Sequence, residues 1–185
     1  MTASGRPRTE ELGPIPENLF REPIDFLYAD HFRRRVICRF LDEIALDPGG
    51  PDVARLSSVA LDYIEQDLPL HVADEERDLF ALLRERCVPE DRLDAILSML
   101  SEEHARDREL SSSLLAGLRS LAMGETLQQP DEFLHVAPAF AEGQRRHLAW
   151  EEAVLFPLAR IRLSQADLDR MGHSMAARRN VAYPA

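Results

Sequence analysis

Two short segments of this chain combine an imidazole with carboxylates at the same spacing. Both have the pattern H-x-x-x-E-E, and they span residues 71–76 and 147–152. If each segment is helical, residues i and i+4 lie one above the other on one helix face, roughly 6 Å apart. His71 with Glu75, and His147 with Glu151, would then each direct a nitrogen and an oxygen toward the same point. This donor set is typical of a metal site.

Apolar runs follow both segments, at residues 79–83 and 154–158. The apolar face of a helix packs against other elements, so these runs predict that both His/Glu pairs face a protein core. A third apolar stripe, between Leu93 and Leu118, is interrupted in its middle. The interruption consists of His104, Asp107, Arg108 and Ser111. Polar groups in a core are costly unless they have partners, so we expect partners for this group too.

Four long helices can position these residues. The apolar spacing and the clusters of proline and glycine between the periodic segments predict helices over about 22–46, 51–86, 89–123 and 130–161. A short amphipathic helix over about 164–179 follows, and Pro69 predicts a kink or break in the second helix. We therefore predict an all-α fold, an up-down-up-down four-helix bundle with a short extra C-terminal helix. The predicted organisation is a loose N-terminal tail (1–19), the bundle (20–161), and the C-terminal helix and tail (162–185).

Composition narrows the classes of partner. The chain has 185 residues, 33 acidic against 22 basic, and a formal net charge of −11. This balance disfavours nucleic acid and anionic membranes as partners, and no run approaches the roughly 18 apolar residues of a transmembrane helix. No apolar segment follows the basic N-terminus, and Cys38 and Cys87 fit no disulfide or metal motif. We expect a cytoplasmic protein.

One histidine on the predicted inner face of each long helix completes the candidate set. These histidines are His31, His71, His104 and His147, and the glutamates Glu75 and Glu151 accompany two of them. Imidazole suits iron, zinc and copper, whereas carboxylates can bridge two ions. The mixture predicts two metal ions that share carboxylates, and the lack of a thiolate motif disfavours a structural zinc or an iron–sulfur cluster.

The order H…H-x-x-x-E…H…H-x-x-x-E, over roughly residues 20–160, resembles the hemerythrin-like, HHE cation-binding family. The resemblance implies a four-helix bundle with a non-haem di-iron centre, oxo- or hydroxo-bridged, in which zinc is a possible substitute. It also implies the metal ligands, which are His31, His71, Glu75, His104, His147 and Glu151, with both glutamates as bridges.

One position departs from the O2-carrying members of the family. Those proteins have H-x-x-x-H on the third helix, whereas Arg108 occupies the second of these positions here, and arginine is not a metal ligand. An open coordination position would result, and Arg108 could stabilise an anionic oxidant or pair with Glu151 or Asp107. Those carriers also place the last carboxylate five residues after the histidine, so Glu152 is an alternative to Glu151.

Further residues are expected near the site. Tyr63 and Asp107 are candidates for contacts behind the ligands. The basic run at residues 33–35 is interpreted as a solvated helix face, because the chain is so acidic.

These features favour a soluble protein that binds, reduces or senses a small oxidant such as O2, peroxide or NO. The alternative is a non-enzymatic iron module for storage, for delivery to cluster repair, or for sensing iron or oxygen. Catalytic turnover would separate the two hypotheses. The sequence identifies neither an electron donor nor an oligomeric state.

Overall fold

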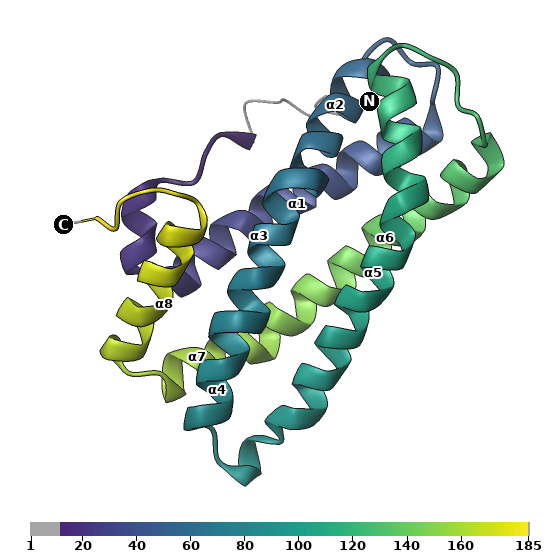
Figure 1. Cartoon of the computed structure of the whole chain (residues 1–185). Helices are drawn as coiled ribbons and strands as arrows, with labels where there is room; N and C mark the ends of the chain where they lie inside the picture. Colours follow the sequence, from purple (N-terminus) through teal and green to yellow (C-terminus); the bar gives the residue numbers. More distant parts are fainter. Residues whose placement is uncertain (1–11, 185) are drawn as a thin grey trace, which may run out of the picture.

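A computed structural model describes residues 12–184. Regular structure in this range is helical throughout, without a strand, so the all-α prediction is confirmed there. The long helical segments lie side by side, with a shorter helix at one end beside the start of the first (Figure 1). Within the same range no helix combines the length and the apolar character needed to cross a membrane.

The elements agree with the predicted helices to within a few residues. The first long segment is the 3-10 helix η2 (Glu17–Arg21) followed by α1 (Pro23–Leu46). The second comprises α2 (Val53–Asp62), η3 (Tyr63–Asp67), α3 (Leu68–Ala73), η4 (Asp74–Leu79) and α4 (Phe80–Arg86). The third is η5 (Pro89–Asp91) with α5 (Leu93–Ala122), and the fourth comprises α6 (Pro130–Trp150), η6 (Glu151–Leu155) and α7 (Phe156–Arg162). The extra helix is α8 (Gln165–Arg178).

The helices α1, α6 and α8 begin with residue types that are common at helix starts. Pro23 and Pro130 stand at the first positions of α1 and α6, where the missing N–H costs nothing and φ is already helical. At the start of α8, the Ser164 side chain accepts from the Asp167 N–H while the Asp167 carboxylate accepts from the Ser164 N–H. This reciprocal cap satisfies two donors that the helix cannot pair internally.

The second and fourth segments contain π-helical turns. The segments η3, η4 and η6 are π-helical. A kink or break was predicted at Pro69, and the chain does not break there. Instead, the Leu68 N–H bonds to the Tyr63 carbonyl five residues back, directly before Pro69. The Phe156 N–H bonds to the Glu151 carbonyl in the same way before Pro157. The wider turn accommodates a ring that would otherwise clash with the preceding turn and lacks a donor.

Each long segment packs against two others. The helix α1 contacts α2 and α6, and α5 contacts the same two. The turns at residues 48–51 and 124–127 line one surface pocket, so they lie at the same end of the bundle. At the α7 end, the Arg162 guanidinium makes two hydrogen bonds to Asp91 in η5. At each end of the bundle, segments that are far apart in the sequence therefore lie close together.

The apolar core is divided into two clusters. One contains the second half of α1, with α2, the end of α5 and the start of α6, and the other contains the start of α1, with α4, the start of α5 and α7. On every long segment, a buried polar stretch separates the members of one cluster from those of the other. The polar residues therefore form a layer across the middle of the bundle.

The helix α8 packs against η2, η4 and α1. Gly172 is required at this contact, because a Cβ there would lie 1.9 Å from the Phe20 carbonyl oxygen. Arg86 adds two hydrogen bonds to the Asp167 carboxylate. Of the N-terminal tail predicted over 1–19, residues 1–11 lie outside the described part, and residues 17–19 belong to η2, whose Phe20 is buried.

Candidate metal centre

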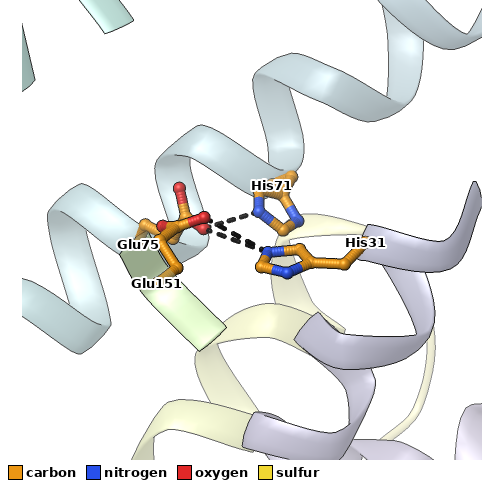
Figure 2. A group of neighbouring side chains, drawn as sticks. All are labelled: His31, His71, Glu75 and Glu151. Carbon is orange, nitrogen blue, oxygen red and sulfur yellow. Dashed lines mark ion pairs between the residues drawn. The ribbon is translucent and has the colours of Figure 1, made fainter. Parts of the chain in front are cut away.

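The polar layer brings all six predicted ligands together. They come from α1, α3, η4, α5, α6 and η6, and none is more than 3% exposed. These residues are His31, His71, Glu75, His104, His147 and Glu151. Figure 2 shows four of them, with the carboxylates of Glu75 and Glu151 side by side and facing the rings of His31 and His71.

The two glutamates lie between the histidines. Glu75 Oε1 is 2.6 Å from His71 Nε2 and 4.0 Å from His31 Nε2, and Glu75 Oε2 is 3.3 Å from His104 Nε2. Glu151 Oε2 is 3.3 Å from His31 Nε2, and its Oε1 is 3.4 Å from His147 Nε2. The Nε2 atoms of His104 and His147 are 3.1 Å apart. Each carboxylate therefore has one oxygen on either side of the cluster.

These residues form two donor groups that can each hold a cation. The first is His31, His71, Glu75 and Glu151, and the second is Glu75, His104 and His147. Within each group the ligand atoms lie within 4.8 Å of one another. The Nε2 atoms of His31 and His71 and all four oxygens of Glu75 and Glu151 are buried without a hydrogen-bond partner. Leaving such atoms unpaired costs about 1–3 kcal/mol each, and a pair of metal ions would satisfy them together. The donor set fits such a pair.

A carboxylate lies behind every histidine. Each Nδ1 atom is 2.9 Å from a carboxylate oxygen of a residue on another segment. The pairs are His31 with Glu152, His71 with Asp30, His104 with Glu76, and His147 with Glu103. A carboxylate on Nδ1 fixes the tautomer and ring orientation of a metal-binding histidine and leaves Nε2 for the metal. Hydrogen bonds of this kind orient His31, His104 and His147 for coordination through Nε2, whereas His71 Nδ1 is in ion-pair contact with Asp30.

Sequence reasoning missed Asp30 and Glu103 in this outer layer. The pattern that identifies them is adjacency, since Asp30 precedes His31 and Glu103 precedes His104. Neither pairs with its neighbour in sequence, however, because adjacent residues of a helix point in different directions. The partner of each is fixed by the packing of the helices.

The remaining candidates occupy distinct places around the layer. Glu152 lies on the Nδ1 side of His31, where it also pairs with Arg35, and these two contacts lower its pKa to about 2. Tyr63 is buried and donates to Asp30 over 2.8 Å. Asp107 accepts a hydrogen bond from the Gln144 amide.

The two arginines near the site are placed differently from expectation. The basic run is not a fully solvated face, because Arg34 is only 2% exposed. It lies three residues after His31 on α1 and so shares the inner face. Arg108 is exposed, and no ion pair joins it to Asp107 or Glu151 among the described residues.

The charges of the cluster favour protonated imidazoles in the metal-free chain. Burial opposes protonation of His31, but the carboxylates of Glu151, Glu152 and Glu75 outweigh it and raise the pKa to about 9. For His147 burial has the same effect, yet Glu151 and Glu103 raise the pKa to about 10. A metal that binds at neutral pH must therefore displace protons from these rings.

Three ion pairs connect the centre to α8. Asp74, directly before Glu75, pairs with Arg178 and with Arg179, and the Arg179 contact measures 2.6 Å. Arg178 also binds Asp78, at 2.7 Å. The segment η4, which carries Glu75, is thus held near both of its ends, at Asp74 and Asp78, by the last residue of α8 and by Arg179.

Comparison with known proteins agrees with this geometry. Residues 22–159 match the model of the hemerythrin HHE cation binding domain. An uncharacterized protein of Haemophilus influenzae is 34% identical over 166 residues, which is 88% of this chain and 92% of that protein. The match to the family model includes residues of all four long segments and all six clustered residues. This chain belongs to the hemerythrin HHE cation-binding domain family.

Proposed function

We propose that this chain is a non-haem di-iron protein that binds, reduces or senses a small oxidant such as O2, peroxide or NO. The observation that carries the proposal is the pair of donor groups that share Glu75, each with two imidazoles. Histidine mixed with carboxylate suits iron, and neither cysteine belongs to a donor group.

The ligand assignment follows from the distances. His31 and His71 would hold one ion, His104 and His147 the other, and Glu75 and Glu151 would bridge them. Glu151 is preferred over Glu152 because both its oxygens face Nε2 atoms, whereas Glu152 lies behind His31. When bound, the two irons supply reversible one-electron chemistry between ferrous and ferric states.

The chain's own residues set the conditions for that chemistry. Glu152, Glu76 and Glu103 hold protons at Nδ1 of their histidines and make the Nε2 atoms better donors, and the Asp30 carboxylate acts on His71 through its charge. The two apolar clusters on either side of the layer lower the polarity of its surroundings and strengthen the electrostatic interactions within it. We further propose the up-down-up-down order for the bundle, which the packing of α1 and α5 against shared neighbours supports. A reducing cytoplasm is consistent with the free Cys38 and Cys87.

The contact between η4 and α8 favours a sensor over a simple carrier. A change at Glu75 on metal binding or oxidation would move Asp74, whose two arginine partners belong to the C-terminal part of the chain. A sensor of this kind requires two arrangements of α8 with different affinity for the two states of the site.

Anaerobic reconstitution with Fe(II), followed by addition of O2, peroxide or NO, tests the proposal. We expect optical changes on oxidation, and loss of both iron and these changes in His71→Ala and His147→Ala. His135→Ala, on the exposed side of α6, is the control and should behave as the parent protein. Iron content that is unchanged in both ligand variants would refute the site. Consumption of oxidant over many cycles indicates an enzyme, whereas a single stoichiometric reaction indicates a sensor or an iron module.

A further inference from the structure

Tyr63 is joined to the proposed metal centre through a single oxygen atom. Its hydroxyl group donates a hydrogen bond of 2.8 Å to Asp30 Oδ2, and the same oxygen is 2.9 Å from His71 Nδ1. The other nitrogen of that ring, Nε2, is 2.6 Å from Glu75 Oε1, on the side where a metal would bind. Buried polar side chains in such a series polarise one another. Two short contacts therefore connect a phenol with the ring of a proposed ligand.

The phenol is enclosed by protein. Tyr63 is 3% exposed and belongs to the apolar cluster around the second half of α1. Burial raises the pKa of its hydroxyl group well above the ordinary value, so the group keeps its proton at neutral pH. A radical on this ring would be shielded from solvent and from other molecules, and it would therefore last long enough to be observed.

Two cations determine how this phenol can be oxidised. The Arg33 guanidinium carbon lies 5.3 Å from the centroid of the Tyr63 ring, and the charge of the buried Arg34 also acts on the phenol. Loss of an electron alone would add a third positive charge to a poorly solvated site, which is costly. Loss of the electron together with the hydroxyl proton leaves the ring neutral. The existing hydrogen bond leads that proton to Asp30.

Asp30 is a weak base, but this proton transfer does not require a strong one. Burial alone would raise its pKa, yet the contact with His71 and the charges of Arg34 and Arg33 outweigh burial and lower it. A phenol that has lost an electron is a far stronger acid than the phenol itself. Its proton therefore moves to the carboxylate even when the pKa of that carboxylate is low.

Tyr28 provides a comparison within the same chain. Its ring centroid is 6.2 Å from that of His31, so it also lies beside a proposed ligand. Its hydroxyl group, however, donates to the backbone carbonyl of Glu152 over 3.4 Å. A peptide carbonyl does not take up a proton at neutral pH. Tyr28 therefore lacks the proton acceptor that Tyr63 has, although both rings are close to the site.

We propose that Tyr63 is a redox-active residue that gives one electron to a peroxide at the metal centre and its proton to Asp30. This inference rests on the proposed di-iron function. Hydrogen peroxide accepts two electrons and two solvent protons as its O–O bond breaks, and it leaves as two waters. When one iron is already ferric, the remaining ferrous ion supplies one electron and becomes ferric. Tyr63 supplies the other and becomes a neutral tyrosyl radical, so a half-oxidised centre can reduce peroxide completely.

Electron paramagnetic resonance of the full chain loaded with Fe(II) tests the proposal. One equivalent of ferricyanide per chain first oxidises one of the two irons, one equivalent of hydrogen peroxide is then added, and the sample is frozen rapidly. We expect a tyrosyl signal that approaches one spin per chain and narrows in protein that contains ring-deuterated tyrosine. Tyr63→Phe should abolish the signal, whereas the matched control Tyr28→Phe should keep it.

A second design leaves Tyr63 unchanged. The chain contains three tyrosines, so the double variant Tyr28→Phe/Tyr183→Phe retains Tyr63 alone and should give the full signal. Absence of a radical in the parent protein, a signal that survives in Tyr63→Phe, or loss of the signal in the double variant would overturn the inference.

Iron content and iron oxidation, measured on every sample, separate this inference from the metal assignment. Oxidation of the irons by peroxide without a tyrosyl radical would overturn this inference alone and leave the di-iron function in place. A parent chain that binds no iron would refute the proposed function itself.

Discussion

The four carboxylates behind the histidines allow a graded test of the centre. Asp30→Asn, Glu103→Gln, Glu152→Gln and Glu76→Gln each keep the shape of a side chain and remove its charge. Their side chains in the native protein are 4%, 12%, 24% and 35% exposed, in that order. Loss of such a partner typically weakens metal binding about 10- to 100-fold. Because water screens the exposed pairs most, we expect about 100-fold for Asp30→Asn and about 10-fold for Glu76→Gln.

Zn(II) affinity, measured by competition with a chromophoric chelator, gives the four values without redox chemistry. Glu142→Gln, an exposed residue on α6 that contacts no histidine, is the control and should leave the affinity unchanged. Asp30 should also show the largest effect because it accepts from Tyr63 and Arg33 as well. Four variants that match the control, or an order of effects opposite to the order of burial, would refute the orienting role of these carboxylates.

Three further predictions concern the rest of the chain. Gly172→Ala should lower the free energy of unfolding by about 1–3 kcal/mol, because the alanine methyl group would clash with the Phe20 carbonyl oxygen. An unchanged denaturation midpoint would contradict the close packing of α8 against this carbonyl. Hydrogen bonds from Arg86 and Ser164 lower the pKa of Asp167 below its ordinary 3.8, so its stabilisation is present above pH 3.8 and is lost as the pH falls further. The difference in Tm between the parent protein and Asp167→Asn should therefore shrink as the pH falls below 3.8, and a difference that stays constant there would count against this pair. Burial raises the pKa of the Cys38 thiol to about 11, so iodoacetamide at pH 8 should label Cys38 only when the protein unfolds. Rapid labelling of Cys38 in the native protein, detected by mass spectrometry, would disprove that burial.

The sequence was sufficient for the helices and the six clustered residues because both depend on local spacing. Apolar periodicity and the capping residues define helix bounds, and the i, i+4 rule places His71 with Glu75 and His147 with Glu151. The π-helical turns were not predicted, since Pro69 was expected to kink or break the helix and not to follow a wider turn. At Pro69 the chain shows that a helix can continue through such a turn.

The rest of the site depends on packing between helices. Asp30 and Glu103 were overlooked because their partners, His71 and His147, lie on other helices, and adjacency to His31 and His104 does not identify those partners. The acidic composition of the chain led us to place Arg34 in solvent together with Arg33 and Arg35. Its position about one turn after His31 instead places it on the inner face of α1, where it is buried. Arg108 was singled out because it replaces the second histidine of the H-x-x-x-H motif. In the structure Arg108 is exposed, and it lines a cavity that the buried Arg34 also lines.

The number of metal ions bound by each chain tests the central claim most directly. Metal analysis of the full chain, reconstituted anaerobically with Fe(II) and freed of excess metal, should give two iron ions per chain, and Glu75→Gln should lose both because the two donor groups share this residue. A single ion per chain, or two ions that remain in Glu75→Gln, would contradict a centre bridged by this carboxylate.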